Sequence, residues 1–182
     1  MPPEEKTHTL KNEVREVIRV LLISLAVVIP IRIFIAQPFI VRGASMEPTF
    51  HDGEYLIVDE ISLRFNELER GEVVIFRYPK DPKSFFIKRI IGLPRETIVI
   101  RDGRVYLSKS GEDLELIDEP YIGDEVFTMP DKAVVLGDDE YFVLGDNRPY
   151  SSDSRAWGPL DLKYIIGRTF IRLWPPSRLN LL

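Results

Sequence analysis

The stretch TIVIRDGRVYL, residues 97–107, decides the fold class of this chain. Two runs rich in β-branched and aromatic residues flank Asp102-Gly103, and an Asp-Gly pair between such runs is the strongest short-range signal of a β-hairpin. The polar residues from Ser108 to Asp113 then predict a loop that closes the second arm. The sequence therefore predicts an antiparallel pair of strands near the middle of the chain.

Segments of similar composition lie on both sides of this hairpin. Four runs are rich in β-branched and aromatic residues and are bounded by turn formers: 54–58, 72–76, 141–144 and 165–173. Pro175-Pro176 ends the last run, because proline cannot donate to a strand ladder. The acidic stretch 111–131 lacks this pattern and is expected to be an irregular excursion. We expect a mainly β architecture of antiparallel strands.

Composition excludes several functional classes. The chain has 182 residues, a formal net charge of −5, no cysteine and two histidines, His8 and His51. The absence of cysteine rules out disulfides and thiolate metal sites, and two histidines disfavour a histidine-based metal site. Phosphate binding requires concentrated Lys and Arg, which the chain lacks. We therefore expect no cofactor, no metal and no nucleic-acid partner.

An apolar segment precedes all of the predicted strands. Val17–Ala36 covers 20 residues, of which only Arg19, Ser24, Pro30 and Arg32 are not plainly apolar. A helix of this length spans roughly 30 Å, the thickness of a bilayer's hydrocarbon core, if the two arginines extend toward the membrane surfaces. More basic residues precede the segment than closely follow it. By the positive-inside rule, this places the N-terminus in the cytoplasm.

Two other interpretations of this segment compete with a membrane anchor. The charge-free run, residues 20–31, also fits a buried core helix, and its length fits a cleavable signal peptide. Phe34-Ile35-Ala36 is a poor small-x-small cleavage site, which favours a retained anchor. We expect a cytoplasmic tail (1–16), one transmembrane helix (17–36) and an extracytoplasmic domain (37–182), in a bacterial plasma membrane or an equivalent such as the thylakoid.

Ser45 is the first candidate for chemistry. It lies in GASMEPT, residues 43–49, where small residues leave its hydroxyl accessible and Pro48 prevents a helix. By turn composition alone, such a serine is a structural turn residue. A serine nucleophile needs a base, and His51 lies six residues later in a polar turn. Lysine can serve instead if burial lowers its pKa from about 10.4 towards 7–8.

Lys88 is the lysine that best meets this requirement. In FFIKRII, residues 85–91, a strand would place Lys88 on one face between Phe86 and Ile90. Lys163 is the only other lysine with apolar neighbours on both sides. A lysine that extends to solvent from a sheet edge is the structural alternative.

A polar loop follows the predicted strand at 141–144. Its sequence, GDNRPYSSDSR (145–155), is dense in hydroxyls and mixed charges. By composition it is a surface turn with side-chain caps and Asp–Arg pairs. In the functional interpretation, a serine of this loop orients a base while an Asp–Arg pair holds the loop rigid.

Together these patches resemble the type I signal peptidases, serine proteases that use a Ser/Lys dyad. Four boxes in the family's order carry the resemblance: 45–49 (SMEPT), 70–74 (RGEVV), 88–94 (KRIIGLP) and 145–155. The likeness extends from the apolar segment to about Gly167. It implies the family's antiparallel, sheet-rich catalytic domain behind one N-terminal transmembrane helix.

The resemblance also implies a role for individual residues. Ser45 would be the nucleophile and Lys88 the general base. Ser151 would orient the lysine by a hydrogen bond, and Asp153 with Arg155 would brace the loop. The Ser45 backbone N–H would donate to the oxyanion. The positions that match the family's substrate pockets are Phe39, Val41, Met46, Phe86 and Ile87. A small apolar pocket of this kind selects an Ala-x-Ala motif before the cut.

Two positions depart from the family pattern. Gly43 stands where some members carry a hydroxyl that donates to the oxyanion, and Arg95 stands where we expect glycine after Leu93-Pro94. The segment between Lys88 and the 145–155 loop is short, which predicts that no large secondary domain is present.

The expected activity is removal of signal peptides from secreted preproteins by a monomer that works at membrane lipid, through an acyl-enzyme on Ser45. Two alternatives stay open. A self-cleaving repressor shares the dyad and the sheet fold, but the apolar segment and the absence of a helix-turn-helix pattern disfavour it. A catalytically silent, membrane-tethered β module would bind extended peptides by strand addition.

Overall fold

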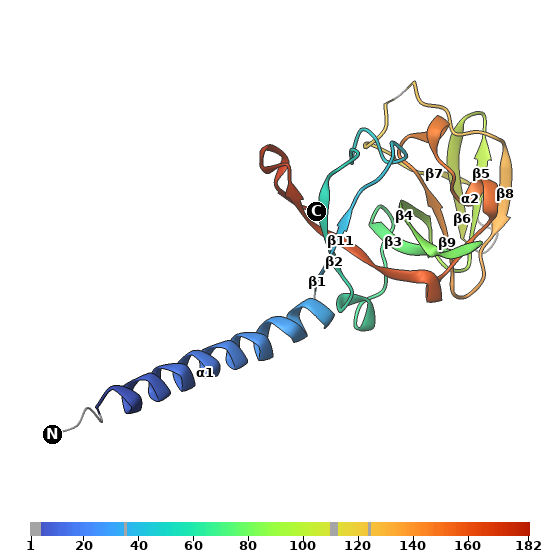
Figure 1. The fold of residues 1–182 in the computed structure, drawn as a ribbon. Coiled ribbons are helices and arrows are strands. Elements are labelled where there is room, and N and C mark those ends of the chain that lie inside the picture. Colours follow the sequence, from blue (N-terminus) through green and yellow to red (C-terminus); the bar gives the residue numbers. More distant parts are fainter. Residues whose placement is uncertain (1–4, 35, 110–112, 124) are drawn as a thin grey trace. The chain divides into compact units, whose positions relative to one another are not determined.

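A computed structural model describes residues 5–34, 36–109, 113–123 and 125–182. The chain divides into two compact units, Met1–Gln37 and Pro38–Leu182. The first unit contains one helix, α1 (Glu5–Phe34), and the second contains the β-sheets (Figure 1). Over the described ranges, no helix combines the length and hydropathy that a membrane span requires. The anchor at 17–36 therefore stays a prediction from sequence; positions 1–4 and 35 lie outside the described residues.

Eight strands form the larger sheet, in the order β1-β2-β11-β3-β4-β9-β10, with β12 paired to β11. They are β1 (Ala36–Ile40), β2 (Tyr55–Asp59), β3 (Val73–Tyr78), β4 (Asp81–Gly92), β9 (Glu140–Leu144), β10 (Leu160–Asp161), β11 (Ile165–Trp174) and β12 (Asn180–Leu181). The pairings from β2 to β12 are antiparallel. The predicted runs return as β2, β3, β9 and β11 with ends shifted by one or two residues, so the mainly β, antiparallel prediction is confirmed.

Four strands form the smaller sheet, in the order β7-β6-β5-β8. They are β5 (Glu96–Arg101), β6 (Arg104–Lys109), β7 (Glu115–Leu116) and β8 (Lys132–Val135). The predicted hairpin is β5–β6, and Asp102 (φ 51°) and Gly103 (φ 75°) both adopt the positive φ that a two-residue type I′ turn requires. The predicted loop begins too early, because Ser108 and Lys109 pair with the start of β5.

The acidic segment 111–131 is mostly irregular, as predicted, but it contributes β7 to the smaller sheet. Positions 110–112 of the predicted loop and position 124 lie outside the described residues. Short helical turns connect other strands: η1 (Ser62–Arg64), η2 (Arg148–Tyr150), α2 (Ser154–Trp157), η3 (Leu162–Tyr164) and η4 (Pro176–Arg178).

Three apolar clusters form the core. One joins the two sheets, with Ile91, Phe142 and Leu144 from the larger sheet and Ile98, Ile100, Val105 and Leu107 from the smaller one. A second includes Val74, Phe76, Ile90, Val143 and Leu160. The third consists of Val41, Met46, Phe50, Leu56 and Val73. Because this third cluster contains the residues around Ser45, the core itself fixes the position of the candidate nucleophile.

Arg95 occupies the turn that leads into β5. Its φ is +67°, a left-handed conformation that glycine adopts without steric cost and that other residues rarely adopt. Its Nε lies 2.8 Å from Asp138 Oδ1 on the protein surface. The expectation of glycine at this position therefore has a conformational basis. In this chain the position is occupied by an exposed arginine that forms an ion pair with Asp138.

Candidate active site

Ser45 lies in a tight turn that is anchored on both sides. Gly43 takes a φ of +84°, and its N–H donates to Asp52 Oδ1 at 2.7 Å. Met46 and Phe50 are each 1% exposed and pack in the third apolar cluster. With its neighbours buried or hydrogen-bonded, the partly exposed Ser45 hydroxyl is held in one place.

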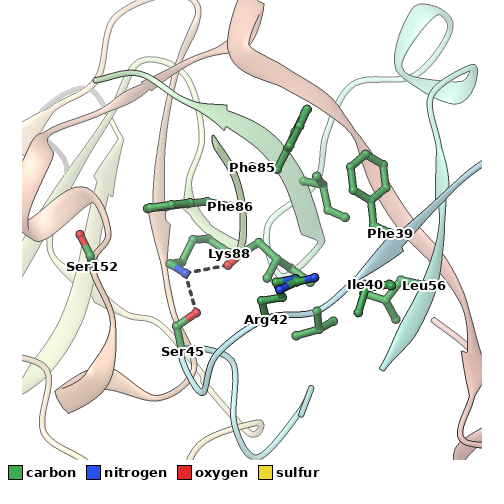
Figure 2. A pocket seen from close by; sticks show the side chains of 12 residues that line it. Phe39, Ile40, Arg42, Ser45, Leu56, Phe85, Phe86, Lys88 and Ser152 are labelled. Carbon is green, nitrogen blue, oxygen red and sulfur yellow. Dashed lines mark hydrogen bonds between the residues drawn. The ribbon is translucent and has the colours of Figure 1, made fainter. Parts of the chain in front are cut away.

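Lys88 reaches this hydroxyl from strand β4. Its Nζ lies 2.7 Å from Ser45 Oγ and 2.8 Å from the Ile87 carbonyl oxygen (Figure 2). The residue is only 3% exposed, and burial lowers the pKa of Lys88 from 10.5 to about 8, although the carboxylates of Asp153 and Asp146 oppose this shift. A substantial fraction of the amine is therefore neutral just above physiological pH.

Strand alternation around Lys88 follows the sequence pattern. Phe86 and Ile90 contribute to the same apolar cluster, and the amine lies 5.5 Å from the centre of the Phe86 ring. These apolar side chains exclude water from the amine. Their position explains physically why Lys88 loses its proton more easily than a surface lysine.

The backbone of Ser45 offers a donor for a developing oxyanion. Among the described residues, no acceptor binds the Ser45 N–H, so it is free to donate to a substrate oxygen. The Gly43 N–H is already bound to Asp52. Position 43 therefore supplies neither a hydroxyl nor a free N–H.

Asn147 ties the 145–155 loop to the Ser45 turn. Its N–H donates to the Ser45 carbonyl at 3.1 Å, and its Nδ2 donates to the Ala44 carbonyl at 2.9 Å. Sequence reasoning assigned Asn147 no individual role, although it lies within the fourth box. Its two bonds show that the turn and the loop form one rigid site.

Asp153 and Arg155 are paired within the loop. The Arg155 Nε and Nη2 atoms each lie 2.8 Å from an Asp153 carboxylate oxygen, and Asp153 is fully buried. Asp153 also accepts from the Gly145 N–H, while Arg155 donates to the carbonyls of Met129 and Arg148. The pair thus connects both ends of the loop with the segment before β8.

Ser151 lies at the site, but the structure lacks the predicted hydrogen bond to Lys88. Its Oγ is buried and has no hydrogen-bond partner among the described residues. It packs against Gly145, where an added Cβ would collide with both Ser151 Oγ and the Ser45 carbonyl oxygen. The prediction was wrong in this structure because the Lys88 amine binds Ser45 and the Ile87 carbonyl instead.

An apolar cavity of about 420 Å³ opens beside the Ser45–Lys88 pair. Its lining residues are Phe39, Ile40, Val41, Arg42, Ser45, Leu56, Ile75, Phe85, Phe86, Ile87, Lys88 and Ser152. The predicted pocket residues Phe39, Val41, Phe86 and Ile87 are among them. Met46 is not, because its side chain is buried in the core beneath the turn.

Several cavity residues were missed by sequence reasoning. Phe85 contacts Phe39 edge-on, with ring centroids 5.6 Å apart, and the two rings form one wall. Phe85 and Arg42 stood next to residues already singled out, so proximity in sequence could have suggested them. Leu56 and Ile75 lie on other strands, and no motif marked them.

The two competing bases lie elsewhere. His51 Nδ1 is 3.6 Å from Glu47 Oε1, and no hydrogen bond joins it to Ser45 in the described structure. The Lys163 side chain is 65% exposed and its Nζ lies 2.5 Å from Asp161 Oδ2, a hydrogen bond that raises the pKa of Lys163. Of the three candidate bases, only Lys88 combines contact with Ser45 and a lowered pKa. Within the described ranges, no cluster of three or more acidic, histidine or cysteine side chains could hold a metal ion.

A buried amine that donates to a serine hydroxyl oxygen beside an open apolar cavity is an arrangement typical of serine hydrolases that use a lysine base. Comparison with protein families agrees with this class. Residues 14–174 match the family described as signal peptidase, peptidase S26, and the chain belongs to this family. It is thus a serine endopeptidase.

Relatives cover nearly the whole chain. A Synechocystis protein named "Probable signal peptidase I-2" is 37% identical over 185 residues, which span 98% of this chain and 82% of that protein. A signal peptidase I of Bacillus licheniformis is 33% identical over 183 residues, 94% of this chain and 95% of that protein. A crystal structure of a signal peptidase I from Enterococcus faecalis shares 27% identity, covers 57% of this chain and 97% of its own, and gives a TM-score of 0.48. Neither the repressor nor the silent binding module gains support from these relatives.

Proposed function

We propose that this protein removes N-terminal signal peptides from secreted preproteins by cutting after a small-x-small motif such as Ala-x-Ala. Ser45 is the nucleophile and Lys88 the general base. The observation that carries the proposal is the 2.7 Å contact between Lys88 Nζ and Ser45 Oγ at a lysine that is almost fully buried. Membership of the signal peptidase family supports the substrate class.

Acylation begins when neutral Lys88 takes the Ser45 hydroxyl proton. The Oγ attacks the carbonyl carbon of the scissile bond, and the carbonyl oxygen becomes an oxyanion near the Ser45 N–H. As the tetrahedral intermediate collapses, the C–N bond breaks and the Lys88 ammonium gives its proton to the leaving amine. The mature protein leaves with a free N-terminus, and the signal peptide remains as an ester on Ser45.

Deacylation uses the same base. Lys88, neutral again after the first step, removes a proton from a water molecule that attacks the ester carbonyl. When the C–O bond breaks, the proton returns to Ser45 Oγ and the signal peptide leaves as a carboxylic acid. The hydrogen bond to the Ile87 carbonyl orients the amine through both steps.

The apolar cavity supports the expected selectivity. In an extended peptide alternate side chains point the same way, so the first and third residues before the cut would enter the cavity together. Its walls include the bulky rings of Phe39, Phe85 and Phe86. Two subsites that share about 420 Å³ with segments of peptide backbone favour small side chains at both positions.

We further propose that residues 17–36 anchor the protein in a bacterial plasma membrane or an equivalent such as the thylakoid membrane, with the catalytic domain outside the cytoplasm. The support is the apolar sequence and its basic N-terminal flank. A protein acting on preproteins meets its substrates at that surface, and we propose that it acts there as a monomer. Protease protection of the second unit in sealed vesicles measures this orientation directly.

Incubation with a synthetic preprotein, followed by mass mapping of the products, tests the function. We expect one cut after the small-x-small motif in wild type and none with Ser45→Ala. A serine-directed acylating probe should label wild type at Ser45. Efficient cleavage after Phe or Lys, or wild-type activity of Ser45→Ala, would refute the proposal.

A further inference from the structure

Arg42 is a charged residue in the wall of the otherwise apolar cavity. It lies three residues before Ser45, its side chain is exposed, and it lines the same cavity as the Ser45–Lys88 pair (Figure 2). In the described structure it makes no hydrogen bond or ion pair with any other side chain. The guanidinium is therefore available to a ligand in the cavity.

The rest of the lining offers no counter-charge. Beside eight apolar residues it contains only the hydroxyls of Ser45 and Ser152, the amine of Lys88 and Arg42 itself. The two acidic residues that follow it most closely along the chain, Glu47 and Asp52, do not line the cavity: Glu47 lies 3.6 Å from His51 Nδ1, and Asp52 accepts from the Gly43 N–H. A peptide lying in the cavity thus meets a cation that no protein carboxylate neutralises there.

We propose that Arg42 is a specificity-determining residue that favours substrates with Asp or Glu among the four residues before the cut and disfavours Lys or Arg there. The inference rests on the proposed function. Small side chains still fill the apolar subsites at the first and third positions. Because the first and third positions hold small apolar side chains, a carboxylate that reaches the exposed guanidinium of Arg42 must come from the second or fourth position of the extended peptide.

The physical basis is a local ion pair. A carboxylate that meets the planar guanidinium can accept two parallel hydrogen bonds, whereas a lysine ammonium at the same place meets a like charge. An exposed pair of this kind is worth about 0.2–1 kcal/mol, and repulsion of the wrong charge adds a similar amount. We therefore expect kcat/KM for an Asp peptide to exceed that for the matching Lys peptide by about two- to tenfold at the position that faces Arg42.

The charge of the whole chain would produce the opposite preference. Its net charge is −5, so the long-range field attracts basic peptides. A preference for acidic residues near the cut can arise only from a local cation. Lys88 is an unsuitable source, because it is buried and reacts in its neutral form, leaving Arg42 as the exposed cation in the cavity.

The test uses the full-length protein in detergent and a parent peptide with Ala at the first and third positions before the cut. Asp, Asn or Lys is placed in turn at the second and fourth positions, and kcat/KM is measured at low salt and in about 1 M NaCl. The readout is the ratio of the Asp to the Lys peptide, which does not depend on the absolute rate of a variant. The variants are Arg42→Gln, Arg42→Glu, Arg42→Lys and, as a matched control, Arg101→Glu.

Arg101 is an exposed arginine on β5 that does not line the cavity, and its replacement by Glu changes the net charge as much as Arg42→Glu does, from −5 to −7. We expect the ratio to exceed one in wild type, Arg42→Lys and Arg101→Glu, to approach one in Arg42→Gln and in high salt, and to fall below one in Arg42→Glu.

Two results would overturn the inference about Arg42 and leave the proposed function standing. One is an unchanged Asp-to-Lys ratio in Arg42→Glu while the parent peptide is cut, and the other is an equal shift of that ratio in Arg101→Glu. If Arg42→Glu does not fold, the same judgement is made from Arg42→Gln. A wild-type protein that folds and leaves the parent peptide uncut would instead overturn the proposed function, and the inference would fall with it.

Discussion

Arg89 and Asp146 form a buried two-point ion pair that joins strand β4 to the loop behind Ser45. Arg89 Nε lies 2.9 Å from Asp146 Oδ1, and Nη2 lies 2.6 Å from Oδ2. Asp146 also accepts from the Thr49 hydroxyl at 2.6 Å, and the next residue, Asn147, holds the Ser45 carbonyl. One carboxylate therefore connects the strand that carries Lys88, the turn that carries Ser45 and the loop 145–155.

Removal of this carboxylate should destabilise the fold strongly. Asp146→Ala leaves the Arg89 guanidinium, whose side chain is 10% exposed, without its counter-charge. Breaking a buried pair by removing one partner costs about 3–5 kcal/mol, which urea unfolding can measure. The double variant Arg89→Met/Asp146→Leu should recover much of that loss, because it buries no unpaired charge. A loss below about 1 kcal/mol in Asp146→Ala would show that the pair does not stabilise the site.

Gly145→Ala should lower activity strongly, although it adds only one methyl group. A Cβ at this position would collide with the Ser45 carbonyl oxygen and with Ser151 Oγ. The Ser45 turn and the 145–155 loop must then shift relative to each other, and a displacement of about 1 Å can cost roughly 10²-fold in rate. Gly123→Ala is the control, because its nearest neighbour would be 4.0 Å away. We expect kcat to fall by at least about tenfold in Gly145→Ala and to stay unchanged in Gly123→Ala.

Much of the fold follows from local sequence. The β5–β6 hairpin needs only positive φ at Asp102 and Gly103, and an Asp-Gly pair supplies it. β2, β3, β9 and β11 follow from runs of β-branched and aromatic residues. Their order in the sheet does not, because β11 pairs with both β2 and β3 at sequence separations of 89 residues or more, and such pairing depends on contacts that no short segment encodes.

In the candidate site, too, some features follow from local sequence and others depend on contacts between distant segments. Lys88 could be selected from its apolar neighbours, but its contact with Ser45, 43 residues away, was expected only from the family resemblance. Met46 was placed in the pocket by the family resemblance, yet the turn directs it into the core. Leu56 and Ile75 line the cavity through the register of their strands. The ring of Tyr121 that covers the Arg89 guanidinium, 3.9 Å away, comes from a segment without any strand pattern.

The buried amine should also make stability depend on pH. The folded pKa of Lys88 is about 8 and its ordinary value is 10.5, so between these values the unfolded chain binds more protons than the folded one. Stability must then rise with pH across this window, by roughly 2–3 kcal/mol between pH 7 and pH 10. Lys88→Met lacks this contribution. The difference in unfolding free energy between Lys88→Met and wild type should favour the variant at pH 7 and shrink by that amount at pH 10. A difference that stays constant with pH would contradict the lowered pKa.

The last prediction concerns the proton that Lys88 accepts in the proposed mechanism. Only the neutral amine can take it, so kcat/KM should rise with pH along a single ionisation limb with a midpoint near the pKa of about 8. Lys88→Arg preserves the charge but cannot deprotonate, and loss of a general base typically costs about 10²–10⁴-fold. Lys88→Arg should therefore be as inactive as Lys88→Met at every pH. Lys163→Met is the matched control, because Lys163 is exposed and paired with Asp161, and it should keep the wild-type rate and midpoint. Circular dichroism establishes folding of each variant first. A folded Lys88→Arg protein with more than about a tenth of wild-type activity would refute the proposed dyad, because a permanently protonated side chain cannot accept the Ser45 proton.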